Sequence, residues 1–298
     1  MKKILLLLVS LFLMISVYGC SENEESNIIE ENKETEIEKT ESEKEETHTK
    51  SSFPTIDEQV LFEYDDIKLT AISIEEDWLG PQLKILIENN SDKNITVELD
   101  AIAVNDCMVS AWLYEDVGPG KKSNATFDIW SSKLSDAGIS NIGKIDMYFR
   151  IIDSDNFNEI YESSEVEIRT SLYDVMDGEI DDIGEEMVNQ NGIKIIGKGV
   201  SNDLIWGDGV VVYIENNTDR NIVVTTDDLS VNGFMVTGFL YQSVRPGKKA
   251  IESIILSSSD LEDNGIESIE ELSLSFEVYD EDSYHTIIKT DEMSFNIE

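Results

Sequence analysis

The sequence predicts an all-β protein with two tandem antiparallel β-sandwich domains, each with one short helix, after a disordered acidic tether. Three observations support this. One stretch of the 298-residue chain recurs at an offset of 127 residues, apolar and polar residues alternate inside both copies, and an apolar leader precedes an acidic stretch without aromatic residues. The segments are a leader (1–19), a tether (20–52), a first sandwich (53–170), an acidic linker (171–190) and a second sandwich (191–298).

The leader predicts export and lipid attachment. Two lysines follow Met1, and the apolar run from Ile4 to Val17 is shorter than the roughly 20 residues that a spanning helix needs. Gly19 and Cys20 end this run in a pattern that resembles a bacterial lipobox, in which the cysteine is acylated. We therefore expect a lipoprotein signal peptide and a membrane anchor at Cys20. The alternative is an ordinary signal peptide with a coincidental cysteine.

The tether, Ser21 to Lys50, contains twelve Glu, four Lys and no aromatic residue. Such a segment buries too little apolar surface to offset its ordering entropy, so we expect disorder. A charged single helix is the alternative, because Glu and Lys favour helices.

Composition excludes several function classes. With 63 acidic and 22 basic residues the net charge is -41, so nucleic acid is not an expected partner. Two cysteines and two histidines offer little for a disulfide scaffold or a metal site, and no cofactor is expected.

The duplication is visible in matching motifs. Residues 88–92 (ENNSD) lie on 215–219 (ENNTD), and both copies contain Pro-Gly-Lys-Lys, at 119–122 and 246–249. About a third of the aligned positions are identical, which is the signature of a tandem repeat. We interpret Pro-Gly-Lys-Lys as a hairpin turn with a lysine at a strand start, and a small positive tip is the alternative.

Within each copy the hydrophobic period is two. Residues 83–87 and 210–214 alternate apolar and polar side chains, as do 147–151 and 274–278. This pattern is typical of strands with one buried face, and the turn signals between them favour about seven strands per copy. A single helical turn interrupts each copy.

The helical turns have start and stop signals. Ser132 and Ser259 are the expected N-caps, and Gly138 and Gly265 fit the left-handed position after each helix.

The string from Ile85 to Lys122, with its Asn-Asn-Ser-Asp, Val-Asn and Pro-Gly-Lys-Lys motifs, resembles the immunoglobulin-like repeats of Gram-positive surface lipoproteins. These are domains of unknown function that follow a lipobox and a polar tether. The resemblance implies β-sandwiches, an extracytoplasmic location and lipid anchoring to the cell membrane, but no activity. The first copy departs from the pattern at Asp106-Cys107, where Gly and an aromatic residue are preferred.

Catalysis is not expected. Cys107 aligns with Phe234 and is predicted to be a core residue, because a nucleophilic cysteine needs a base and the one histidine outside the tether is His285. The acidic run 174–186 suggests calcium, but it lacks the spacing of a calcium-binding loop, and turn chemistry explains Asp equally well.

Two tryptophans are candidate ligand-facing residues. Trp78 and Trp206 follow the first strand of their copies, near a sandwich end where binding loops gather. The alternative is that each caps its own sandwich, and Trp112 is expected in the core.

The sequence therefore predicts a non-catalytic surface lipoprotein that binds an unknown protein or cell-wall ligand. A calcium- or solute-binding lipoprotein is the alternative, and a carboxylate-only hydrolase is a further one.

Overall fold

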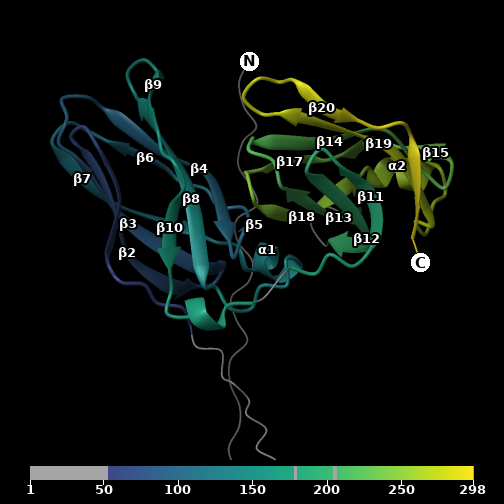
Figure 1. Ribbon diagram of the computed structural model, residues 1–298, viewed down its shortest axis with the longest axis horizontal. Helices are drawn as coiled ribbons and strands as arrows, with labels where there is room; N and C mark the ends of the chain where they lie inside the picture. Colours follow the sequence, from purple (N-terminus) through teal and green to yellow (C-terminus); the bar gives the residue numbers. More distant parts are fainter. Residues whose placement is uncertain (1–52, 178–179, 204–206, 298) are drawn as a thin grey trace, which may run out of the picture. The chain divides into compact units, whose positions relative to one another are not determined.

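A computed structural model describes residues 53–177, 180–203 and 207–297 (Figure 1). Strands account for 57% and helices for 6%, which confirms the all-β prediction. After residue 48 the chain forms one compact unit. The leader, the tether with Cys20, and Trp206 lie outside the described residues. Within the described ranges, no helix has both the length and the apolar character needed to cross a bilayer.

Residues 53–177, called the first half below, contain two antiparallel sheets joined by one short helix. One sheet has the order β1-β2-β3-β7, and in the other β8 pairs with β4, β9 and β10 while β4 also pairs with β5 and β6. The elements are β1 (Gln59–Tyr64), β2 (Ile67–Asp77), β3 (Gly80–Asn89), β4 (Ile95–Val104), β5 (Cys107–Met108), β6 (Tyr114–Val117), β7 (Lys121–Asp128), α1 (Ser131–Asp136), β8 (Lys144–Asp153), β9 (Glu159–Glu162), β10 (Val166–Arg169) and the 3-10 turn η1 (Tyr173–Val175).

Residues 180–297, called the second half, repeat this arrangement. Strands β11, β12, β13 and β18 are neighbours in that order, and β14 pairs with β15, β17 and β19. The elements are β11 (Glu185–Gln190), β12 (Ile193–Asp203), β13 (Gly207–Asn216), β14 (Ile222–Val231), β15 (Phe234–Met235), β16 (Gly238–Phe239), β17 (Tyr241–Val244), β18 (Lys249–Leu256), α2 (Ser258–Asp263), β19 (Glu271–Asp280), β20 (Thr286–Lys289) and β21 (Met293–Asn296).

The strand registers of the two halves agree at the sequence offset of 127. Ile95 lies opposite Asp153, and Ile222 lies opposite Asp280. A bulge interrupts the β2–β3 ladder after Ala71, and a bulge interrupts the β12–β13 ladder after Gly197. Because a one-residue slip moves every side chain to the other sheet face, agreement in register means that the same alternate residues are buried in both halves.

The alternating residues form two hydrophobic clusters, one mainly in each half. Leu83, Ile85 and Ile87 of β3 are fully buried, as are Val210, Val212 and Ile214 of β13. The predicted period-two strands are therefore confirmed, with one face of each packed inside.

The repeated Glu-Asn-Asn motif closes the turn after β3 and after β13. The Asn89 side chain donates to the carbonyls of Lys93 and Val117, both at 2.8 Å. Asn216 donates likewise to Arg220 and Val244, also at 2.8 Å. Both amides are fully buried, so they satisfy carbonyls that water cannot reach.

The helix starts differ from the sequence prediction. Trp130 is the N-cap residue of α1 without a side-chain cap, and Ser257, not Ser259, caps α2 by accepting from Asp260 N–H. Each helix begins earlier because the preceding strand runs directly into it. Gly138 and Gly265 have φ of 70° and 67°, so the predicted left-handed stops are confirmed.

Candidate functional site

A cavity of about 530 Å³ opens at one end of the first half. Three segments line it: Phe53 and Pro54, the turn between β2 and β3 with its flanking residues (76–81), and α1 with the loop after it (131–142). Its apolar walls come from prolines, Leu134 and isoleucines, and Ser131, Ser135 and Ser140 contribute hydroxyl groups. Its volume lies within the range of small-molecule sites.

Backbone contacts hold the β2–β3 turn against α1. Ile129 N–H donates to Pro81 O at 2.8 Å, and Ser131 N–H donates to Leu79 O at 2.9 Å. Gly80 has φ of 146°, and a Cβ there would collide with the Ile129 carbonyl. Glycine is therefore required at the position where the turn meets the segment before α1.

Two tryptophans flank this cavity. Trp78, at the tip of the β2–β3 turn, is 86% exposed, and Trp130, directly before the lining residue Ser131, is 46% exposed. The sequence singled out Trp78 but not Trp130, which has no special position in the pattern. Trp206 lies outside the described residues. Large aromatic rings are usually buried on folding, so two exposed rings beside one cavity suggest a binding role.

The charge at this cavity is negative. Glu76 and Asp77 line it, and none of the described lining residues is Lys or Arg. Lys133 of α1 is turned away, with its ammonium 2.9 Å from Glu252 of β18. The site therefore offers carboxylates, hydroxyls and aromatic rings to a ligand.

Further aromatic side chains are exposed at matching positions of the two halves. Trp112 is 74% exposed and stacks on Tyr114 with 6.2 Å between ring centroids. Phe239 and Tyr241, 127 residues later, are also exposed. The prediction that Trp112 belongs to the core is wrong, because its strand neighbour β6 covers the sheet edge and leaves the ring outside.

The two halves meet along a parallel bridge between β5 and β18, in which Cys107 lies opposite Lys249. Cys107 is fully buried there, whereas its counterpart Phe234 on β15 is half exposed. Cys107 is buried as predicted, but the shared apolar position is covered only in the first half. Ile196, Tyr213 and Ile251 of the second half complete the hydrophobic cluster of the first.

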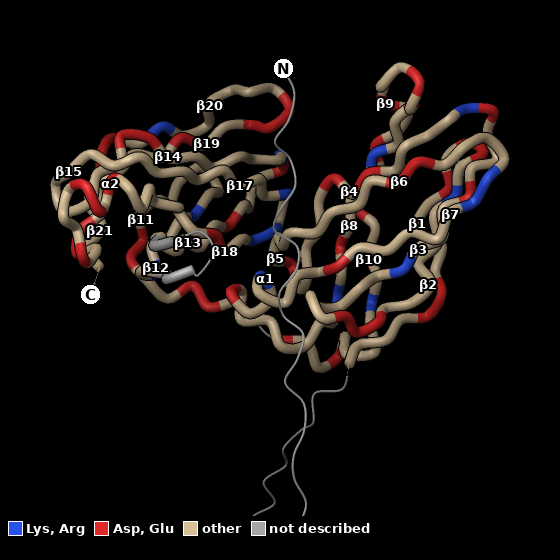
Figure 2. The backbone as a smooth tube through the Cα atoms, turned by 180° about the vertical axis from the view of Figure 1, so that it is seen from behind, with Lys and Arg blue, Asp and Glu red and all other residues tan. Residues whose placement is uncertain are grey.

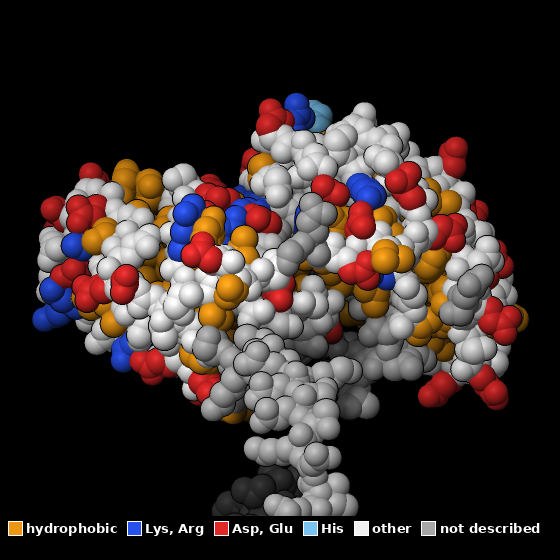
Figure 3. Space-filling view, turned by 60° about the horizontal axis from the view of Figure 1, so that its bottom comes forward, with side chains coloured by type: hydrophobic (Ala, Val, Ile, Leu, Met, Phe, Trp, Pro, Cys, Tyr) orange, Lys and Arg blue, Asp and Glu red, His pale blue; other side chains and the backbone are white. Residues whose placement is uncertain are grey.

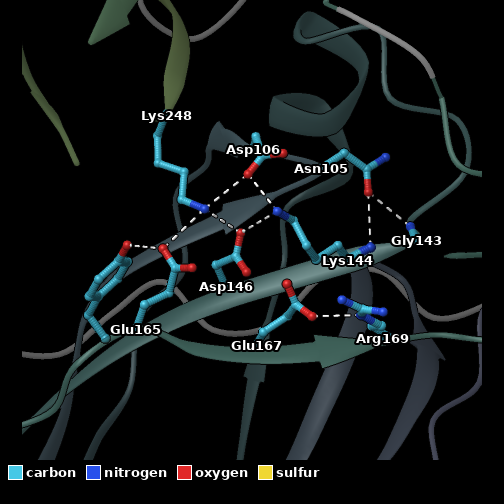
Figure 4. A network of polar contacts seen from close by, with 10 residues as sticks. Asn105, Asp106, Gly143, Lys144, Asp146, Glu165, Glu167, Arg169 and Lys248 are labelled. Atoms are coloured by element: carbon cyan, nitrogen blue, oxygen red, sulfur yellow. Dashed lines mark hydrogen bonds and ion pairs between the residues drawn. The ribbon is translucent and has the colours of Figure 1, made fainter. Parts of the chain in front are cut away.

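A buried ion cluster seals this junction (Figure 4). The Lys248 ammonium lies 2.6 Å from Asp146, 3.0 Å from Asp106 and 3.1 Å from Glu165, all from the first half. Lys144 lies 2.6 Å from Asp106 and 3.3 Å from Asp146.

Arg245, three residues before Lys248, pairs with Asp100 and sits over the Tyr148 ring. Our interpretation of the repeated lysines as simple turn residues is therefore wrong for Lys248, which is buried. Lys121, its counterpart in the first half, is exposed.

The electrostatics of this cluster follow from burial and pairing. Burial raises the pKa of Asp146 above its usual value. Burial also opposes ionisation of Asp106, but hydrogen bonds from Lys144 and Lys248 hold its pKa below the usual value. Burial works against the Lys248 cation too, but the acceptors Asp146 and Asp106 raise its pKa overall. Paired charges inside the junction act structurally rather than chemically.

The other sequence candidates remain apart from each other. Burial raises the pKa of the Cys107 thiol to about 11, so it is a poor nucleophile. His285 precedes β20 in the second half, and Cys107 lies at the junction. Among the described residues, no three His, Cys, Asp or Glu side chains converge in a metal-binding group, the acidic run included.

Acidic residues are distributed over both halves (Figure 2), and the face in Figure 3 carries them over much of its area rather than at one point. This wide negative field favours cations and basic molecules over anions.

Comparisons with known proteins do not identify a family. No family model matches the chain, and no curated protein matches it. Solved structures that are similar include the YadV chaperone (10% identity, 78% of this chain and 100% of that one, TM-score 0.25) and a conserved domain protein from Bacillus anthracis (13%, 84% and 94%, 0.26). A protein of unknown function from Porphyromonas gingivalis W83 is also similar (9%, 78% and 94%, 0.19). These TM-scores are too low to support an argument about function.

Proposed function

We propose that this protein is a non-catalytic lipoprotein of a Gram-positive cell surface, anchored through Cys20, that presents two tandem immunoglobulin-like domains to an extracellular ligand. The observation that carries the binding role is the cavity of about 530 Å³ beside the exposed Trp78 and Trp130. The described lining residues combine this cavity with hydroxyls and carboxylates but include no His, Cys or Lys that could act as a base or nucleophile.

The strand order supports the immunoglobulin-like assignment. In the first half, β2-β3-β7 are neighbours in one sheet, and β10, β8, β4 and β6 are neighbours in the other. This matches strands A-B-E and G-F-C-C′ of immunoglobulin domains, with β1 as an extra edge strand. The second half has the corresponding orders β12-β13-β18 and β21-β19-β14-β17.

Membrane fractionation tests the anchor. Cys20→Ser removes the acylation site, so we expect the protein to move from the membrane fraction to the medium, because a polypeptide without acyl chains has no anchor. A Cys20→Ser protein that remains with the membrane would contradict the lipoprotein assignment.

Retention on intact cell walls and on immobilised culture-medium components tests the binding role. We expect mature Cys20→Ser protein to be retained, and Trp78→Ala with Trp130→Ala to abolish most of that retention. Trp112→Ala is the matched control, since Trp112 is exposed but lies away from the cavity-lining segments. Equal loss in the control, or no retention of the parent protein, would contradict the proposal.

The alternative is a calcium- or solute-binding lipoprotein, which the cavity volume and its two carboxylates, Glu76 and Asp77, also favour. A ligand that binds the folded state raises the thermal midpoint by mass action. No shift at about 5 mM calcium would remove the calcium form of this alternative, since that concentration exceeds the dissociation constants of weak extracellular calcium sites.

A further inference from the structure

The cavity beside Trp78 has a charge and a composition that select for one kind of ligand. Its lining includes Glu76 and Asp77, and the described lining residues include no Lys or Arg. An anionic ligand would meet two carboxylates without a counter-charge, in a protein of net charge -41. A cation would gain from both.

The flanking tryptophans narrow the class further. Indole is the strongest aromatic partner for a cation, and exposed cation–π pairs contribute about 0.5–1 kcal/mol each. Trp78 follows the lining residue Asp77 directly, and Trp130 precedes the lining residue Ser131. A hydrogen bond between Ser131 N–H and Leu79 O joins the two tryptophan-bearing segments. An organic ammonium group is the chemistry that carboxylates and indole rings bind together.

The only lysine of α1 does not neutralise the site. The Lys133 ammonium lies 2.9 Å and 3.0 Å from the two carboxylate oxygens of Glu252, on β18 of the second half. The junction therefore holds this cation away from Glu76 and Asp77. The carboxylates stay available to an external cation.

We propose that the cavity lined by Glu76 and Asp77, between the turn that carries Trp78 and the segment that carries Trp130, binds the ammonium group of a small organic cation. This inference rests on the proposed binding function and adds its ligand class. A quaternary ammonium and a primary ammonium share the chemistry, and the experiment below separates them.

The experiment is a fluorescence titration of the mature protein carrying Cys20→Ser, in which Trp112→Phe and Trp206→Phe leave Trp78 and Trp130 as the reporters. The probes are choline chloride and lysine amide, with sodium chloride at equal ionic strength, cellobiose and calcium chloride as comparisons. We expect a saturable emission change with choline or lysine amide. Tighter binding of choline assigns a quaternary ammonium, and tighter binding of lysine amide assigns a primary one.

Charge-matched variants test the location. Glu76→Gln with Asp77→Asn should weaken binding about tenfold or more, because both carboxylates face the cation. Asp65→Asn with Asp66→Asn removes the same charge from the exposed β1–β2 turn and should change binding less than about twofold, since exposed charges further than a Debye length are screened.

Three outcomes would overturn the inference. Equal weakening in the two charge variants would mean attraction by the general negative field. Saturable binding of cellobiose without binding of either ammonium probe would replace the ligand class and leave the proposed function standing. Absence of any saturable change would remove the ammonium assignment, and wall retention would then decide the proposed function separately.

Discussion

Replacing Lys248 with methionine tests whether the buried ion cluster holds the two halves together. Methionine keeps most of the side-chain volume and removes the cation that contacts Asp106, Asp146 and Glu165. Asp146 is fully buried, and its second carboxylate oxygen has no hydrogen-bond partner among the described residues, so the loss leaves an undercompensated charge.

The size of the effect follows from what remains. Removing one member of a buried ion pair destabilises a protein by about 3–5 kcal/mol. Lys144 stays 3.3 Å from Asp146, which places Lys248→Met near the lower end, at about 3 kcal/mol. For a chain of this size, that corresponds to a fall in Tm of about 6–12 °C.

Differential scanning calorimetry of the mature Cys20→Ser protein measures this shift. Lys121→Met is the matched control, because Lys121 has the same motif position in the first half but is exposed, and it should change stability by no more than about 0.5 kcal/mol. Adding Asp146→Asn to Lys248→Met should recover part of the loss, since the buried carboxylate is then neutral. Equal Tm values for Lys248→Met and Lys121→Met would refute the reasoning.

Three further predictions concern buried groups. Asn216→Ala should destabilise by about 2–3 kcal/mol in urea unfolding, because two buried carbonyls lose their donor; no change in midpoint would contradict this. Gly80→Ala should destabilise by at least about 1 kcal/mol, since φ of 146° is strained for alanine and its Cβ meets the Ile129 carbonyl; an unchanged Tm would contradict this strain. Cys107 has a pKa raised to about 11, so its contribution to stability is present below the unfolded thiol pKa and is lost as pH rises through about 11. Thiol labelling at pH 8 should therefore need unfolding, and rapid labelling of the native protein would contradict burial.

Much of the fold could be predicted from local pattern. Alternation in 83–87 and 210–214 identifies the buried faces, because side chains in a strand point to opposite sides of the sheet. The offset of 127 residues carries over to the strand register, and Gly138 and Gly265 mark the helix ends as expected.

The candidate site was only partly predictable. Trp78 was identified from its place after the first strand, but Trp130 was missed because it follows a strand in no recognisable turn motif. Their proximity depends on the contact of Ser131 with Leu79, which joins segments about 50 residues apart. A linear pattern contains no record of such contacts.

The amino-acid pattern was sufficient to assign strands, their buried faces and the repetition, since these depend on spacing along the chain. Tertiary packing decided which outer surfaces are covered. Lys121 and Lys248 occupy the same Pro-Gly-Lys-Lys position, yet one is exposed and the other is buried among three carboxylates. Cys107 and Phe234 differ in the same way. The reason is that burial of an outer sheet face depends on what the other half brings against it, and that partner lies more than 100 residues away in the chain.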